Sequence, residues 1–213
     1  MRSLDSTKGF ARAAISSLAI VSATLSWFGC ASAVELGRVN TGATAPAFIA
    51  PGADGQPHRL KDYAGKLVVL EWTSPVCPFT ALKYKNGSMQ ALQRYAAAHD
   101  VVWLSIDTSA PGRAGYLTAA AAKERILQTQ STVTAFLFDI DGSIASRYGA
   151  KTTPSFFIVD RSGKLAYQGA MDDQVFADQG TGREYAKSAL EDLIAGRRVR
   201  DPETQPQGCA IEY

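Results

Sequence analysis

Residues 71–85 have the sequence EWTSPVCPFTALKYK, and this stretch decides the fold. It continues an apolar run from Leu67 to Leu70, which is typical of a strand that is buried on both faces. Pro78 follows Cys77, and proline suits the first position of a helix because its missing N–H is no loss there. The stretch therefore predicts a central strand that delivers a cysteine to the start of a helix.

Strands and helices alternate on both sides of this stretch. Apolar runs and turn residues predict further strands at 47–49, 101–106, 135–138, 156–159 and 165–168. Helical spacing and capping residues predict helices after Cys77, again from Met89, and at 118–128, 144–148 and 184–194. The last two strands form a hairpin around a turn at 160–163. The pattern predicts an α/β sandwich, with a mixed central sheet and helices on both faces.

The first 33 residues have the features of a secretory signal peptide. Basic residues precede an apolar run at 13–28, and Ala31-Ser32-Ala33 offers the small-x-small pattern of a cleavage site. The run is shorter than the roughly 20 apolar residues that a membrane-spanning helix needs. We therefore expect cleavage near Ala33 and an exported, periplasmic protein, rather than a retained anchor. Cys30 fits a lipoprotein site poorly, because bulky residues precede it.

The remaining chain divides into a single domain, 34–196, and an arm, 197–213. The arm contains proline and glycine among polar residues and has no helical or strand period, so we expect an irregular segment that carries Cys209. Cleavage after Ala33 leaves 19 basic and 19 acidic residues. A neutral chain without a basic cluster lacks the charge that nucleic acid or anionic lipid would attract. We expect no nucleic-acid partner and no membrane span after cleavage.

Two cysteines, Cys77 and Cys209, remain after cleavage, in a compartment where disulfides persist. A cysteine at a helix start can have a lowered pKa, because unpaired backbone N–H groups and the helix dipole stabilise the thiolate. The hydroxyl of Thr80, one turn on, is placed to donate a hydrogen bond to the sulfur. The alternative is that Cys77 is a buried apolar residue, but its polar and proline-rich neighbours favour a reactive thiolate.

Short motifs along the chain support the same reading. They are the run WTSPVCPF from Trp72 to Phe79, Thr-Thr-Pro at 152–154 before the hairpin, and turns at Asp139, Tyr148 and Asp160. Together they resemble thioredoxin-fold proteins of the redoxin type, the alkyl hydroperoxide reductase/thiol-specific antioxidant (AhpC/TSA) relatives. The resemblance covers most of residues 45–195 and implies a thioredoxin-like three-layer sandwich.

The resemblance adds two positions to the site. Pro154 matches a proline that is cis and faces the reactive cysteine in such folds, and Thr153 would contribute adjacent backbone that can pair with a bound peptide. The alternative is an ordinary trans proline that opens a strand. Glu71, six residues before Cys77, is either a buried carboxylate that relays protons or a solvated acid at a strand end. Trp72 is expected to pack beside the site.

The sequence departs from the family at two points. Thr80 occupies the position of the second cysteine in Cys-x-x-Cys. The peroxiredoxin pattern of Pro, Thr and Cys is replaced by Leu70, Ser74 and Cys77. Peroxidase activity is therefore an alternative rather than the main expectation.

Turnover at Cys77 needs a resolving thiol, and Cys209 is the candidate within the mature chain. The alternative is a permanent disulfide that closes a loop of more than 100 residues, worth on the order of 5 kcal/mol.

The main hypothesis is a thiol–disulfide oxidoreductase with an external reductant and a thiol or disulfide partner, either a protein or a small molecule. A thiol-dependent peroxidase and a non-catalytic binding module with a structural disulfide are the alternatives. We expect no cofactor and no metal, because His58 and His99 show no ligand spacing to either cysteine.

Overall fold

The computed structural model describes residues 39–174 and 182–212. The chain divides by its contacts into residues Met1–Val34 and Glu35–Tyr213, and the description below concerns the second unit. The expected signal peptide lies outside the described residues. No helix within the described ranges is long and apolar enough to cross a bilayer.

A mixed sheet of five strands forms the centre of the domain. Its order is β5 (Ala135–Phe138), β4 (Val102–Asp107), β3 (Val68–Thr73), β7 (Ser155–Val159) and β8 (Leu165–Gly169). The first three strands are parallel to one another, β7 is antiparallel to β3, and β8 is antiparallel to β7. Every residue of β3 and β4 is buried, as the apolar runs predicted. The expected thioredoxin-like mixed sheet is confirmed.

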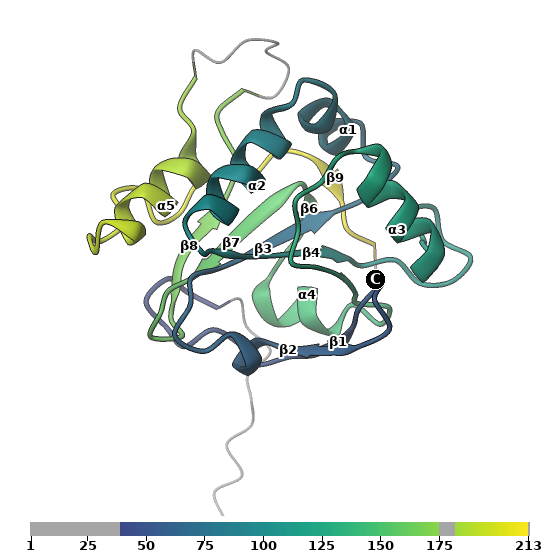
Figure 1. The fold of residues 1–213 in the computed structure, drawn as a ribbon, viewed down its shortest axis with the longest axis horizontal. Helices are drawn as coiled ribbons and strands as arrows, with labels where there is room; N and C mark the ends of the chain where they lie inside the picture. The colour runs from purple at the N-terminus through teal and green to yellow at the C-terminus, as the bar shows by residue number, and fades with distance from the viewer. Residues whose placement is uncertain (1–38, 175–181, 213) are drawn as a thin grey trace, which may run out of the picture. The chain divides into compact units, whose positions relative to one another are not determined.

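Helices cover both faces of this sheet (Figure 1). The first face carries α1 (Pro78–Lys85), α2 (Ser88–Ala98) and α5 (Tyr185–Ile194), and the opposite face carries α4 (Ser143–Tyr148). Helix α3 (Ala119–Gln128) packs on β5 through Ala122 and Phe136. The result is the three-layer arrangement that the alternation of elements predicted.

Two hydrophobic clusters lie on the two faces because side chains alternate along each strand. Val69 of β3 and Trp103 of β4 belong to the cluster under α2 and α5. Leu70 and Trp72 of β3 point the other way and join the cluster that includes Tyr148 of α4. The same strand therefore anchors both layers.

Local signals fixed most helix ends as expected. Gly87, with φ of 80°, separates α1 from α2 at the predicted break. The side chain of Thr118 accepts a hydrogen bond from Ala121 N–H and caps α3. Gly149, with φ of 67°, ends α4 in the left-handed conformation that glycine favours.

Two small sheets flank the central one. The first joins β1 (Ile49–Pro51) to β2 (Pro57–Arg59), followed by the 3₁₀ helix η1 (Leu60–Tyr63). The second joins β6 (Thr152–Thr153) to β9 (Cys209–Ala210) in antiparallel register.

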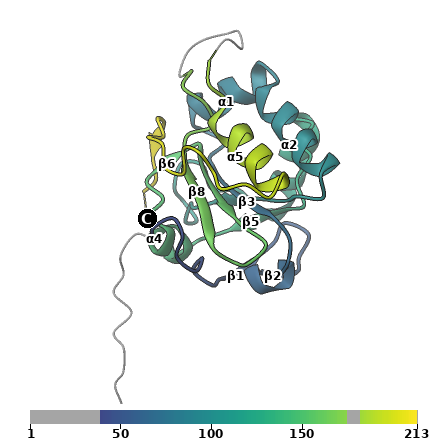
Figure 2. The ribbon, with the colours of Figure 1, turned by 90° about the vertical axis from the view of Figure 1, so that its left-hand side faces the viewer.

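The prediction of an irregular C-terminal arm was wrong in its last part. The arm first runs beside β8, where Gln168 N–H donates to Pro202 O at 2.9 Å and Thr204 N–H donates to Gln168 O at 3.0 Å. It then forms β9 against β6, and Ile211 N–H donates to Lys151 O at 2.9 Å. Figure 2 shows this yellow segment reaching β6 after passing β8. Backbone pairing therefore holds Cys209 in a fixed register.

Candidate active site

Cys77 lies in the connection between β3 and α1, directly before the first residue of the helix. It is the N-cap of α1, with φ of −79° and ψ of 117°, and Pro78 takes the first helical position. The side chain is only 1% exposed. Its sulfur donates a hydrogen bond to Thr153 O at 3.0 Å. The helix start and the strand β6 thus enclose the thiol from two sides.

The peptide bond between Thr153 and Pro154 is cis, which confirms the expectation drawn from the resemblance. Thr153 ends β6, and the carbonyl that faces the Cys77 sulfur belongs to this same peptide unit. The sequence-based placement of Thr153 and Pro154 next to Cys77 therefore agrees with the geometry.

Cys209 faces Thr153 across the β6–β9 pair. Both cysteines are free thiols, and they lie close enough for each to shift the pKa of the other. The backbone N–H of Phe79, in the first turn of α1, acts to lower the pKa of Cys209. The C-terminal arm thus brings the second thiol to the first, over more than 100 residues of sequence.

The surroundings of the two thiols shift their pKa values in opposite directions. Burial raises the pKa of Cys77, but the polar groups around its sulfur outweigh burial and lower the pKa below its ordinary value. The Cys209 thiol makes the largest of these contributions, and the backbone N–H groups of Thr80 and Cys209 add to it. Burial and the neighbouring Cys77 raise the pKa of Cys209 to about 11. Cys77 therefore ionises to the thiolate more readily, and Cys209 keeps its proton.

The predicted role of the Thr80 hydroxyl was wrong. Its Oγ1 atom is buried and has no hydrogen-bond partner among the described residues. It is the backbone N–H of Thr80, not the hydroxyl, that helps to lower the pKa of Cys77. At the third helical position this N–H has no partner within the helix.

Glu71 is fully buried, so the alternative of a solvated acid is excluded. Trp103 Nε1–H and Ser105 Oγ–H donate to its Oε2 at 2.8 and 2.7 Å, and Tyr84 O–H donates to Oε1 at 3.4 Å. Burial raises the pKa of Glu71 against these hydrogen bonds. Among the described residues its partners are these three side chains, so the carboxyl is linked to α1 through Tyr84.

Trp72 packs on the α4 face of the sheet. Its ring lies 5.0 Å from that of Phe157 and 5.5 Å from that of Tyr148, measured between centroids. Its Nε1–H donates to Thr108 Oγ1 at 3.2 Å. Trp72 is therefore a core residue, and it lies near the end of β3 that leads to Cys77.

Sequence reasoning missed Asp107, the last residue of β4. It pairs in register with Thr73 at the end of β3 and is buried, and burial raises its pKa to about 7 despite a hydrogen bond from Ser109. The sequence did contain a signal for Asp107. It is an acidic residue at the end of an apolar strand, and the carboxyl ends of parallel strands lie together at one edge of the sheet.

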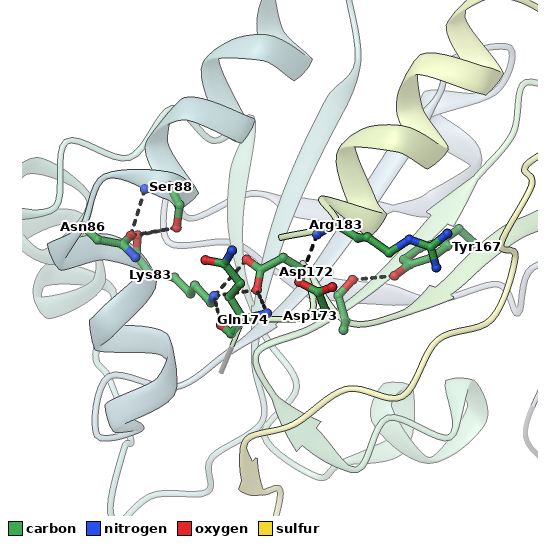
Figure 3. A network of polar contacts seen from close by, with 9 residues as sticks. Lys83, Asn86, Ser88, Tyr167, Asp172, Asp173, Gln174 and Arg183 are labelled. Atoms are coloured by element: carbon green, nitrogen blue, oxygen red, sulfur yellow. Dashed lines mark hydrogen bonds and ion pairs between the residues drawn. The ribbon is translucent and has the colours of Figure 1, made fainter. Parts of the chain in front are cut away.

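A cleft of about 430 Å³ opens beside the cysteine pair. Phe79 and Pro154 form the wall nearest the thiols. Deeper in the cleft, Lys83 Nζ bonds to both carboxylate oxygens of Asp172 at 2.7 and 2.8 Å and to Gln174 O at 2.6 Å. Figure 3 shows Lys83 pointing from α1 toward Asp172. Within residues 39–174 and 182–212, no three His, Cys, Asp or Glu side chains are grouped to hold a metal ion.

Comparisons with known proteins agree with this geometry. The family model described as AhpC/TSA matches residues 41–168. The thiol-disulfide oxidoreductase ResA of Geobacillus thermodenitrificans is 28% identical over 133 residues, which is 62% of this chain and 70% of that protein.

Two solved structures have similar folds. A conserved, uncharacterized protein from Geobacillus kaustophilus is 25% identical with a TM-score of 0.73, and the match covers 82% of this chain and 92% of that one. A Chlorobium tepidum protein assigned as the thiol:disulfide interchange protein DsbE is 24% identical with a TM-score of 0.53, covering 74% and 97% of the two chains.

Proposed function

Because the chain belongs to the AhpC/TSA family of thioredoxin-fold redoxins, we propose that it is an exported thiol–disulfide oxidoreductase. Cys77 is the nucleophile and Cys209 the resolving thiol. The observation that carries the proposal is the pair of free thiols that the β6–β9 pairing brings together, since Cys77 bonds to Thr153 O and Cys209 pairs in register with Thr153. The similarity to a protein named thiol-disulfide oxidoreductase supports the same reaction type.

The proposed cycle begins with the Cys77 thiolate. It attacks one sulfur of a disulfide, forms a mixed disulfide, and releases the other sulfur as a thiolate that takes up a proton. Cys209, after losing its proton, attacks the Cys77 sulfur, so that the substrate leaves as a second thiol and a Cys77–Cys209 disulfide remains. Two electrons have then passed from the pair to the substrate, and an external dithiol reductant returns them.

The pKa difference between the thiols supports this division of roles. A lowered pKa makes Cys77 the better thiolate at neutral pH. The raised pKa of Cys209 keeps it protonated until the mixed disulfide forms. Oxidation of Cys77 then removes the negative charge that raises the pKa of Cys209.

Pro78, Phe79 and Thr80 form the helix start that surrounds the pair. Pro78 fixes the first turn without using an N–H group, while the N–H groups of Phe79 and Thr80 act to lower the pKa of Cys209 and Cys77 respectively. Thr153 contributes its carbonyl to Cys77. We assign supporting roles to these residues and to Glu71, Trp72 and Pro154.

Export rests on the sequence of residues 1–33, with its basic start, apolar run and Ala-Ser-Ala site. N-terminal sequencing of the protein recovered from the periplasm is expected to begin at Val34. A chain that stays in the cytoplasm and retains Met1 or Arg2 at its start would contradict export.

Thiol state after oxidation tests the reaction. Wild type, Cys77→Ser and Cys209→Ser are treated with a model disulfide or with hydrogen peroxide, and the products are identified by mass spectrometry. The proposal expects a Cys77–Cys209 disulfide in wild type, a trapped adduct on Cys77 in Cys209→Ser, and no adduct in Cys77→Ser.

Other outcomes separate the alternatives. Fast peroxide consumption that depends on Cys77, with slow reaction toward disulfides, would make the protein a thiol-dependent peroxidase. A reduction potential below about −300 mV, with a Cys77 that reacts with neither oxidant, would indicate a structural disulfide in a binding module.

A further inference from the structure

Strand β6 lies against Cys77, whose sulfur donates to Thr153 O, and the protein's own C-terminal segment occupies the backbone edge of this strand. Residues Cys209 and Ala210 pair with Thr153 and Thr152, and Ile211 N–H bonds to Lys151 O at 2.9 Å. Cys77 is only 1% exposed in this arrangement. A second chain can pair with β6 only if the segment 207–211 leaves it.

A glycine makes the close approach of this segment possible. A Cβ atom added to Gly208 would overlap Thr153 O, and it would lie 2.6 Å from Thr153 C and 3.2 Å from Pro154 N. These backbone atoms belong to the peptide unit whose carbonyl accepts the Cys77 thiol. They are held by the antiparallel pairing and cannot move aside as a flexible side chain would. The residue directly before the docked cysteine must therefore lack a side chain.

The preceding part of the arm is anchored independently of this contact. Thr204 Oγ1 accepts a hydrogen bond from Ala170 N–H at 2.9 Å and lies 2.6 Å from Tyr167 O–H. Gly169 leaves room for it, because a Cβ there would lie 2.8 Å from Thr204 N. The segment after Thr204 can consequently leave β6 while the rest of the arm stays on β8.

We propose that the protein substrate docks as residues 207–211 do: an extended segment with a glycine immediately before its reactive cysteine, bound to the β6 edge in place of the C-terminal segment. The chain's own Gln-Gly-Cys-Ala-Ile is then both a template for the substrate and its competitor. This inference rests on the proposed function, because it describes the substrate of the same cysteine pair.

Peptides with and without the glycine test the proposal. Gln-Gly-Cys-Ala-Ile and Gln-Ala-Cys-Ala-Ile are each prepared as a mixed disulfide with thionitrobenzoate. The Cys77 thiolate attacks the peptide sulfur, a protein–peptide disulfide forms, and thionitrobenzoate leaves as a coloured thiolate, so that the reaction is followed by absorbance and its product is identified by mass spectrometry.

The reaction is measured on the full chain in two backgrounds. Cys209→Ser removes the resolving thiol but keeps Gly208, so the C-terminal segment still competes. Gly208→Ala combined with Cys209→Ser adds the overlapping Cβ and releases the segment. We expect the glycine peptide to react faster in the released background than in Cys209→Ser, and about tenfold or more faster than the alanine peptide in both.

A matched control is Glu212→Ala combined with Cys209→Ser, which changes an exposed residue beyond β9 and leaves Gly208 in place. It is expected to react like Cys209→Ser alone. Equal rates for the two peptides in both backgrounds would overturn the proposal, as would equal rates with and without the Gly208→Ala change.

A small disulfide, 5,5′-dithiobis(2-nitrobenzoate), distinguishes this failure from failure of the proposed function. If it modifies Cys77 while the two peptides remain indistinguishable, the cysteine is reactive and only the docking inference is wrong. If neither it nor any peptide reacts with Cys77 in the released background, the proposed function itself fails.

Discussion

At the scale of single residues, the Cys77 sulfur is the group on which the chemistry depends. Neighbouring polar groups hold its pKa below the ordinary value, and the Cys209 thiol contributes the largest share of this lowering. Replacing Cys209 with alanine removes that donor and exchanges it for a methyl group. The residue pair therefore predicts coupled titration, in which each thiol sets the reactivity of the other.

The rate of Cys77 alkylation as a function of pH measures this coupling. In wild type we expect a midpoint below about 8.5, the value of an unperturbed cysteine. Cys209→Ala is expected to move the midpoint upward. A midpoint that is unchanged or lower in Cys209→Ala would show that Cys209 does not lower the pKa of Cys77.

Glu71 predicts a pH dependence of stability. Burial raises its pKa in the folded protein above that of the unfolded chain. Its contribution is therefore fully present below the unfolded pKa and is lost as pH rises toward the folded pKa, by at most about 1.4 kcal/mol per pH unit. We expect the free energy of unfolding to fall over this interval in wild type and to vary less in Glu71→Gln.

Urea denaturation between pH 4 and pH 8 checks this expectation. Glu124→Gln is the control, because Glu124 is exposed on α3. Its profile should follow wild type. If Glu71→Gln also follows wild type, Glu71 does not titrate differently in the folded and unfolded states.

The sequence identified the central residues of the site but not all of their roles. Cys77 was found from the strand-to-helix junction and Pro154 from its position before the hairpin. The burial of Glu71 was undecided, because a single acid after an apolar run fits a strand end as well as a strand interior. The Thr80 hydroxyl was assigned wrongly, because residue spacing does not show whether a buried hydroxyl points toward the sulfur or away from it.

At the scale of elements, Lys83 and Asp172 tie α1 to the segment that follows β8. Their side chains are 9% and 14% exposed. The bond joins α1, which follows Cys77, to Asp172 on the other side of the cleft (Figure 3). Because the pair is largely desolvated, removing the lysine leaves a carboxylate without its charge partner. Such a loss costs about 3 kcal/mol or more.

Lys83→Met tests the strength of this tie by urea denaturation. We expect a loss of about 3 kcal/mol in the free energy of unfolding. Lys66→Met is the matched control, since Lys66 pairs with Asp100 at the surface, where the side chains are 47% and 82% exposed. Its loss should stay within about 1 kcal/mol. Equal effects of the two changes would mean that burial does not strengthen the pair.

The sequence predicted long elements better than short ones. The apolar runs of β3 and β4 are strong local signals, and both strands were found. Strands β6 and β9 have two residues each and owe their existence to each other. They are separated by more than 50 residues of sequence, so no local sequence pattern predicts either strand. The pairing that positions Cys209 was therefore outside the reach of sequence periodicity.

At the scale of the whole molecule, oxidation of the cysteine pair would close a loop over most of the domain. Loop closure of this length restricts the unfolded chain by on the order of 5 kcal/mol. We expect the oxidised protein to be more stable than the reduced protein, but by less than this amount, because the disulfide of a redox enzyme must remain reducible by its partner.

Urea denaturation with and without a reductant measures this difference. Cys209→Ser is the control, because it cannot form the bond and should be insensitive to the reductant. A wild-type protein whose stability is also insensitive, although mass spectrometry shows the bond, would contradict the loop-closure argument.

The alternation of side chains along the central strands also separates the domain's fluorophores. Of the three tryptophans, Trp27 lies in the segment expected to be cleaved, which leaves Trp72 in one hydrophobic cluster and Trp103 in the other. Emission from Trp72→Phe would report the layer under α2 and α5, and emission from Trp103→Phe the layer that includes α4. The protein therefore carries one intrinsic optical probe for each layer, and a comparison of the two signals during unfolding would show whether both layers melt together.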